Sequence, residues 1–155
     1  MIARMDTVVK PQGCTNLKLR QLMRRVAAHY DAEVGKTGLK GTQYSLLSYV
    51  VKLGPVRPGD LAAEMRVSPS TLTRNMRPLV DAGLIEIGPG ADARSRLVSV
   101  TAVGREKRQE AQRRWRVAQE GINDMLGPRR VVQLHALLDE CLERLAPASP
   151  ADEDA

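Results

Sequence analysis

The sequence predicts a mainly helical α+β fold in which one β-hairpin interrupts a series of helices. Apolar residues recur at helical spacing over most of the 155 residues, and over one short stretch they alternate with period two. Gly and Pro stand at the ends of most periodic segments. Hydrophobic residues make up 43% and charged residues 27% of the chain, which are ordinary values for a globular protein. The length suits a single domain.

The first two helices are expected at residues 15–34 and 44–54. In the first, apolar residues recur at steps of three and four between arginines, and Gly35 and Gly38 end the helix. The second helix has a shorter apolar set and ends near Gly54. The two apolar sets are Leu19, Leu22, Met23, Val26, Tyr30 and Val34, then Tyr44, Leu47, Val50 and Val51.

Two short helices joined by a tight turn are expected next, at residues 58–65 and 69–82. Ser68 is a good N-cap for the second helix, and Pro69 loses no hydrogen bond at its first position. Gly83 suits the left-handed residue that ends it. This pair is therefore a candidate helix-turn-helix.

A β-hairpin follows the candidate helix-turn-helix. Ile85 and Ile87 lie on one face of the first strand, and Val98 and Val100 alternate with their neighbours in the second. The connecting loop, residues 89–96, contains no large apolar residue and is expected to project into solvent or onto a partner. A helix pair followed by such a hairpin is a winged helix-turn-helix. The charged residues of the loop are Asp92, Arg94 and Arg96.

Two long helices complete the fold, one capped by Thr101 and one that follows Gly127 and Pro128. A helix of about 24 residues extends roughly 36 Å, which is longer than the core of one chain of this size requires. Part of the apolar stripe is therefore expected to meet a second copy of the chain in a homodimer. The stripe consists of Ala111, Trp115, Ala118, Ile122 and Met125, then Val131, Leu134, Leu138, Cys141 and Leu145.

The charge distribution favours a polyanionic partner. The chain carries 24 Lys and Arg against 18 Asp and Glu, for a net charge of +6. Residues 1–54 hold nine basic and three acidic residues, whereas residues 121–155 hold three basic and seven acidic ones. This polarity suits a polyanion bound along one side. On charge alone, a set of solvated helix faces is the alternative.

Several classes of protein are disfavoured. No apolar run approaches the roughly 18 residues of a membrane span, and the N-terminus lacks the apolar segment of a secretory signal, so a cytoplasmic protein without a membrane partner is expected. Cys14 and Cys141 form no CxxC or CxxH spacing, so neither a disulfide framework nor a metal site is expected. His29 and His135 lack a neighbouring nucleophile, and nucleotide-binding and hydrolase motifs are missing, so neither a catalytic residue nor a cofactor is expected.

The second helix of the helix-turn-helix pair is expected to enter the major groove of double-stranded DNA, while the basic loop reaches a minor groove or a phosphate row. Leu72, Met76 and Leu79 face inward, and an outward arginine can pair bidentately with guanine. Pro78 should bend or loosen the last turn. The alternative to a DNA-binding helix is an ordinary amphipathic helix whose outer face is polar only to keep it in solvent. The candidate contacts on this helix are Ser68, Ser70, Thr71, Thr73, Arg74 and Arg77.

The chain resembles the MarR family of bacterial transcription regulators over residues 16–146. Three motifs carry the resemblance: GDLA at 59–62, SPSTLTR at 68–74 and DARSRLVSVTAVG at 92–104. The resemblance implies a homodimer that binds a pseudo-palindromic operator, with its first and last two helices interlocked. It also implies that Asp92 orients the wing and that Arg94 enters the minor groove.

This organisation divides the chain into four parts. Residues 1–13 are expected to form a flexible arm and residues 147–155 a disordered acidic tail. Residues 14–41 and 102–146 form a helical dimerisation region, and residues 42–101 form the winged helix-turn-helix domain.

The resemblance further implies release from DNA by a small aromatic or phenolic acid, or by thiol oxidation, and we expect the protein to act as a repressor. A cation with aromatic walls would suit an aromatic carboxylate. Cys14, before the first helix, is the candidate thiol for the oxidant-sensing alternative, since a helix dipole and basic neighbours lower a thiol pKa. Alternatively, Cys14 is an incidental thiol. On the alternative interpretation of the candidate ligand set, its arginines are solvated or paired and its tyrosines belong to the core. The candidate ligand-binding residues are Arg20, Arg24, His29, Tyr44 and Tyr49.

Overall fold

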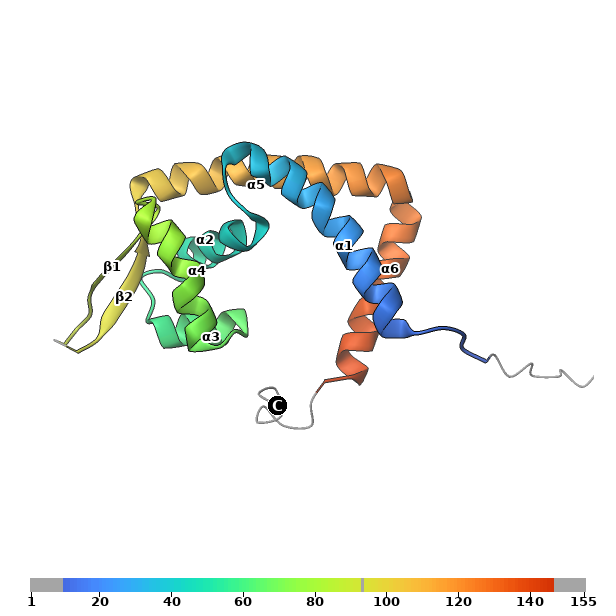
Figure 1. The fold of residues 1–155 in the computed structure, drawn as a ribbon, viewed down its shortest axis with the longest axis horizontal. Helices are drawn as coiled ribbons and strands as arrows, with labels where there is room; N and C mark the ends of the chain where they lie inside the picture. Colours follow the sequence, from blue (N-terminus) through green and yellow to red (C-terminus); the bar gives the residue numbers. More distant parts are fainter. Residues whose placement is uncertain (1–9, 93, 147–155) are drawn as a thin grey trace, which may run out of the picture.

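The computed structural model describes residues 10–92 and 94–146, which form six α-helices, one 3-10 turn and a two-stranded sheet (Figure 1). The predicted mainly helical fold with one hairpin is therefore confirmed. The acidic tail and most of the N-terminal arm lie outside the described residues. In chain order the elements are α1 (Thr15–Val34), η1 (Gly35–Thr37), α2 (Gly41–Leu53), α3 (Pro58–Met65), α4 (Pro69–Asp81), β1 (Ile85–Pro89), β2 (Arg96–Val100), α5 (Ala102–Leu126) and α6 (Pro128–Arg144).

The long helix α5 joins two groups of elements. Figure 1 shows α2, α3, α4 and the hairpin below one end of α5, and α1 and α6 descending from its other half. The hydrophobic core lies mainly in the first group, which we call the winged lobe (residues 42–101). No helix within residues 10–92 and 94–146 is long and apolar enough to cross a membrane. The most buried side chains of the lobe are Leu46, Leu47, Val50, Leu61, Leu72, Leu79, Ile85 and Val98.

Local sequence signals set the ends of α4. The Ser68 hydroxyl accepts a hydrogen bond from the Thr71 backbone N–H at 3.2 Å, as an N-cap does. Gly83 follows the helix with φ of +69°, a conformation that favours glycine. The helix continues through Pro78, so the proline does not end it. The predicted inward residues of α4, namely Leu72, Met76 and Leu79, are all buried.

The turn between α3 and α4 holds Arg66 in the left-handed conformation, with φ of +53°. Among the described residues it is the one non-glycine residue with a positive φ. This conformation costs an L-residue about 1–2 kcal/mol because Cβ approaches a carbonyl oxygen. The turn is closed by backbone hydrogen bonds from Arg66 to Ala63 at 3.1 Å and from Val67 to Ala62 at 3.0 Å.

The hairpin is antiparallel and pairs Ile85 with Val100 at its base. Val56, from the segment between α2 and α3, extends the sheet by one bridge to Val98, with N–O distances of 3.1 and 2.8 Å. The sequence pattern did not indicate this bridge, because a single paired residue has no periodicity. It ties the hairpin to the helix-turn-helix.

A close contact joins the end of α4, the start of β1 and the start of α5. Thr101 caps α5 as predicted, since its hydroxyl accepts from Gly104 N–H at 3.0 Å, and it donates to the Gly83 carbonyl at 2.6 Å. Gly104 is buried against the Leu84 backbone, and a Cβ at this position would lie 1.9 Å from the Leu84 carbonyl oxygen. No residue with a side chain fits there without a shift of the backbone.

Candidate nucleic-acid interface

The exposed face of α4 carries short hydroxyl side chains and two arginines. The hydroxyls are partly engaged within the helix, since Ser68 donates to the Thr71 hydroxyl at 2.9 Å and Thr73 donates to the Pro69 carbonyl at 2.9 Å. The guanidinium groups of Arg74 and Arg77 make no hydrogen bond to the described residues. Of the six predicted contacts on this helix, Ser68, Ser70, Thr73, Arg74 and Arg77 are exposed and Thr71 is half-buried.

The loop between β1 and β2 is folded around Asp92. Its carboxylate oxygen Oδ1 accepts hydrogen bonds from the backbone N–H of Ser95 at 2.7 Å and of Arg94 at 3.0 Å. These bonds, Ser95 first, hold the pKa of the Asp92 carboxyl below its usual range because they stabilise the charged form. A backbone hydrogen bond from the Gly90 N–H to the Ser95 carbonyl at 2.8 Å closes the loop. Asp92 thus fixes the backbone from which the exposed Arg94 side chain projects.

The basic side chains of the winged lobe are free of acidic partners within the part of the chain that the structure describes. The four ion pairs found there, at 2.6 to 3.7 Å, all lie outside residues 42–101. A cation without an internal partner is available to neutralise a phosphate. The exposed, unpaired basic residues of the lobe are Lys52, Arg57, Arg66, Arg74, Arg77, Arg94 and Arg96.

These cations belong to elements with the shapes that double-stranded DNA accepts. Figure 1 shows α4 beside α3 and the free end of the hairpin projecting away from α5. A helix of this kind fits the major groove, and a narrow loop reaches the adjacent minor groove or the phosphates.

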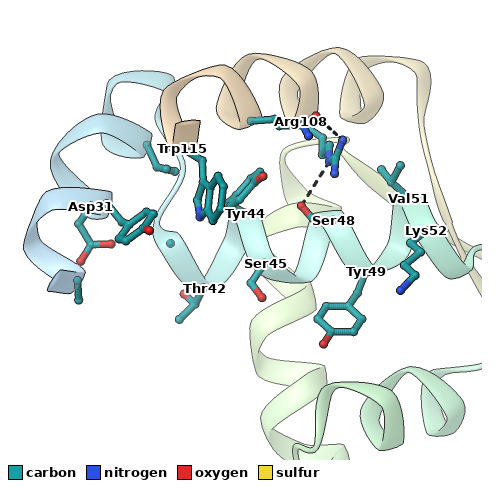
Figure 2. Close-up of a pocket in the computed structure, with 15 residues that line it drawn as sticks. Asp31, Thr42, Tyr44, Ser45, Ser48, Tyr49, Val51, Lys52, Arg108 and Trp115 are labelled. Carbon is teal, nitrogen blue, oxygen red and sulfur yellow. Dashed lines mark hydrogen bonds between the residues drawn. The ribbon is translucent and has the colours of Figure 1, made fainter. Parts of the chain in front are cut away.

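A cavity of about 1000 Å³ lies where α1, α2 and α5 meet (Figure 2). Its walls include Tyr30, Tyr44, Tyr49 and Trp115, and the rings of Tyr30 and Trp115 are 5.5 Å apart. Burial raises the pKa of Tyr30, which donates a hydrogen bond to the side chain of Gln119 at 2.5 Å. Each of the three helices thus contributes at least one aromatic side chain to the wall of the cavity.

Two cations and one carboxylate line the same cavity, namely Lys52, Arg108 and Asp31. Figure 2 shows Arg108 above Ser48, to which its Nε donates a hydrogen bond at 3.4 Å. Its Nη1 donates to Gln112 at 2.6 Å. The guanidinium is therefore held in place by α2 and α5 together.

The structure brings part of the predicted ligand set to this cavity. Tyr44 and Tyr49 line it, whereas Arg20, Arg24 and His29 are exposed on α1 and are not among its lining residues. The sequence reasoning missed Arg108, which lies 60 residues from Ser48 along the chain, because no local pattern links α5 to α2.

Both cysteines are exposed. Cys14 occupies the N-cap position of α1 without a side-chain capping bond, and Cys141 lies on α6. The surface of this chain therefore leaves both thiols accessible.

The fold and the unpaired cations define a DNA-binding protein of the winged helix-turn-helix class. Comparison with known proteins agrees with this class. A sequence profile described as MarR family matches residues 37–95. The chain is also 26% identical over 93 residues, which are 60% of this chain and 68% of the relative, to a Bacillus subtilis protein named as the uncharacterized HTH-type transcriptional regulator YwoH.

Solved structures extend the likeness to most of the chain. The transcriptional regulator MosR of M. tuberculosis, crystallised in complex with DNA, is 31% identical, with a TM-score of 0.67 over 87% of this chain and 100% of that one. Wild-type MarR from E. coli in its apo form has the same fold, with 18% identity and a TM-score of 0.70 over 85% and 99% of the two chains. This chain belongs to the MarR family, and it is a DNA-binding transcription regulator rather than an enzyme.

Proposed function

We propose that this regulator is a repressor that binds a pseudo-palindromic operator as a homodimer and is released by a small aromatic or phenolic acid. The observation that carries this proposal is the cavity of aromatic walls and cations between the winged lobe and α1 and α5. A ligand held there would touch both the winged lobe, through α2, and the dimerisation region, through α1 and α5. The relative position of these two parts sets the spacing between the two copies of α4, the recognition helix, in the dimer.

The unpartnered apolar surface of α1 and α6 supports the homodimer. Val131 is the one buried residue of α6 within the described chain, and Leu142 and Leu145 are 71% and 83% exposed. Apolar surface on this scale is unfavourable in water and is typical of an interface. A second copy would cover it, with residues 14–41 and 102–146 as the dimerisation region. The large exposed apolar residues of α1, the last turn of α5 and α6 with its C-cap are Leu17, Leu19, Met23, Met125, Val132, Leu137, Leu142 and Leu145.

Release would follow from a change in the position of α5. Arg108, a residue of α5, is held by hydrogen bonds to α2 and to α5 itself. The N-cap of helix α5 is Thr101, whose hydroxyl contacts Gly83 just after the end of α4. A ligand that prefers one spacing of the lobes shifts the population toward that spacing. The dimer without ligand would hold the operator, and the liganded dimer would release it.

Within the interface, Arg74 is proposed to read base edges and Arg94 to enter the minor groove. We expect Arg94→Ala to weaken binding to all duplexes and Arg74→Ala to relax the preference at particular bases. Binding is measured by fluorescence anisotropy with duplexes selected from a random library. Arg113→Ala, an exposed arginine of α5, serves as the control. If neither variant changes operator affinity, the assignment of this DNA-binding face is wrong.

The effector proposal is tested with benzoate and 2-hydroxybenzoate, and with benzyl alcohol as the uncharged control. We expect the two acids to change the fluorescence of Trp115 and to dissociate the operator complex. Arg108→Gln should weaken this response about tenfold or more because it removes a charge-assisted hydrogen bond, while Arg113→Gln should not. An unchanged response of Arg108→Gln would remove Arg108 from the site.

The exposure of Cys14 favours one second candidate, a regulator released by thiol oxidation. Peroxide treatment should then dissociate the complex of the wild type and of Cys141→Ser but leave that of Cys14→Ser intact. Equal release or equal retention by wild type and Cys14→Ser would eliminate this alternative.

A further inference from the structure

We propose that Arg66, in the turn between α3 and α4, binds a DNA phosphate and anchors the recognition helix on the backbone of the duplex. This inference rests on the DNA-binding function and adds a contact that neither the recognition helix nor the wing supplies. It assigns a role to the residue that the chain holds in a left-handed conformation.

The first observation is that the conformation of this position disfavours arginine. With φ of +53°, the backbone here suits glycine, and asparagine is the next most tolerant residue. A residue that is kept in an unfavourable conformation directs attention to its side chain.

The second observation is that the Arg66 side chain contributes nothing visible to the fold. It is exposed, and it forms no hydrogen bond or ion pair with residues 10–92 and 94–146, although the acids Asp60 and Glu64 lie on the preceding helix. The turn itself is closed by backbone bonds from Arg66 and Val67, which an asparagine or glycine would also make. The charge is therefore available to a partner outside the chain.

The third observation is the place of Arg66 in the interface. It stands two residues before Ser68, the N-cap of α4, at the end of the recognition helix that carries the exposed hydroxyls. Figure 1 shows this turn on the side of the lobe away from α5. A helix-turn-helix brings the N-terminal part of its second helix to the bases, so a cation beside that end meets the flanking phosphates. Phosphate contacts of this kind fix the position of a protein on DNA without reading sequence.

The test separates the conformational cost from the phosphate contact by comparing Arg66→Gly, Arg66→Asn and Arg66→Lys. Gly and Asn relieve the unfavourable backbone conformation and remove the positive charge, whereas Lys retains the unfavourable conformation and the charge. Affinity for a mixed-sequence duplex of about 30 base pairs, long enough for two half-sites, is measured at several salt concentrations. Arg116→Gln, an exposed arginine on α5 with no ion pair among the described residues, is the charge-matched control.

We expect Arg66→Gly to raise Tm by about 2–4 °C and yet to weaken DNA binding about three- to tenfold. In Arg66→Gly the slope of log K against log salt should become less steep by about 0.9 for each subunit on the duplex, because one fewer counterion is released. Arg66→Asn should act in the same direction, which keeps the test valid if the glycine variant folds poorly. Arg66→Lys and Arg116→Gln should keep the wild-type slope.

Wild-type affinity and slope in Arg66→Gly or Arg66→Asn would overturn the inference, as would a reduced slope in Arg66→Lys. In either case the wild type still binds DNA and the proposed function stands. A wild-type protein that binds no duplex would instead overturn both.

Discussion

Gly104 offers a quantitative test of the close contact that joins α4, the wing and α5. In Gly104→Ala, the new Cβ would lie 1.9 Å from the Leu84 carbonyl oxygen, where ordinary contacts are 3.4 Å or longer. The carbonyl cannot move away easily, because the backbone N–H of Thr101 donates to it at 3.1 Å and Leu84 N–H bonds to Leu79 at 2.9 Å. The conflict involves backbone rather than the end of a flexible side chain.

Overpacking of this kind costs about 1–3 kcal/mol, and the upper half of that range applies where backbone has to shift. We therefore expect Gly104→Ala to reduce the free energy of unfolding by about 2–3 kcal/mol. With a urea m-value of about 2 kcal/mol per molar, the midpoint should fall by about 1–1.5 M. The fluorescence of Trp115, the one tryptophan of the chain, and circular dichroism follow the transition. Protein concentration is held constant, because dimerisation would contribute to stability.

Gly121→Ala is the matched control, since it makes the same change in the same helix. No atom lies within 4 Å of a Cβ built there, so alanine should raise stability by up to about 1 kcal/mol through its better helix propensity. The two substitutions are expected to have opposite signs. A Gly104→Ala protein as stable as the wild type would refute the argument that Gly104 is packed tightly against the Leu84 backbone.

Three further predictions concern the N-cap of α4 and the loop between β1 and β2. Ser68→Ala should reduce the free energy of unfolding in urea by about 1 kcal/mol, because the Thr71 N–H loses its acceptor. The control Ser70→Ala should change it by less than about 0.5 kcal/mol. Equal effects of the two substitutions would show that Ser68 is not the N-cap. Asp92→Asn should weaken DNA binding by loosening the backbone of Arg94, and an unchanged affinity would show that the loop does not depend on the carboxylate. The pKa of the Asp92 carboxyl is lowered in the folded chain. The stability that this carboxylate contributes is therefore fully present above the ordinary value of 3.8 and is lost as the pH falls through the lower folded value. Amide chemical shifts of Arg94 and Ser95 that change near neutral pH would contradict this prediction.

Much of the fold could be predicted from sequence because its boundaries are set by neighbouring residues. Ser68 and Thr101 cap their helices with their own side chains, and Gly83 and Gly127 take positive φ at the helix ends. Each signal acts within about four residues, so no knowledge of distant parts of the chain was needed. The inward face of α4 followed in the same way from helical spacing.

The cavity and the close contact at Gly104 were decided by tertiary structure. Arg108 meets Ser48 across 60 residues, and the need for glycine at position 104 arises from the Leu84 backbone, which only the folded chain places there. Arg20 and Arg24 shared a helix with cavity residues but lie outside the cavity, because the crossing of α1 over α2 and α5 selects which part of its surface is enclosed. Sequence fixes what each segment forms by itself, whereas the packing of segments decides which distant side chains share one space. That packing depends on the sum of many contacts, and no short pattern encodes it.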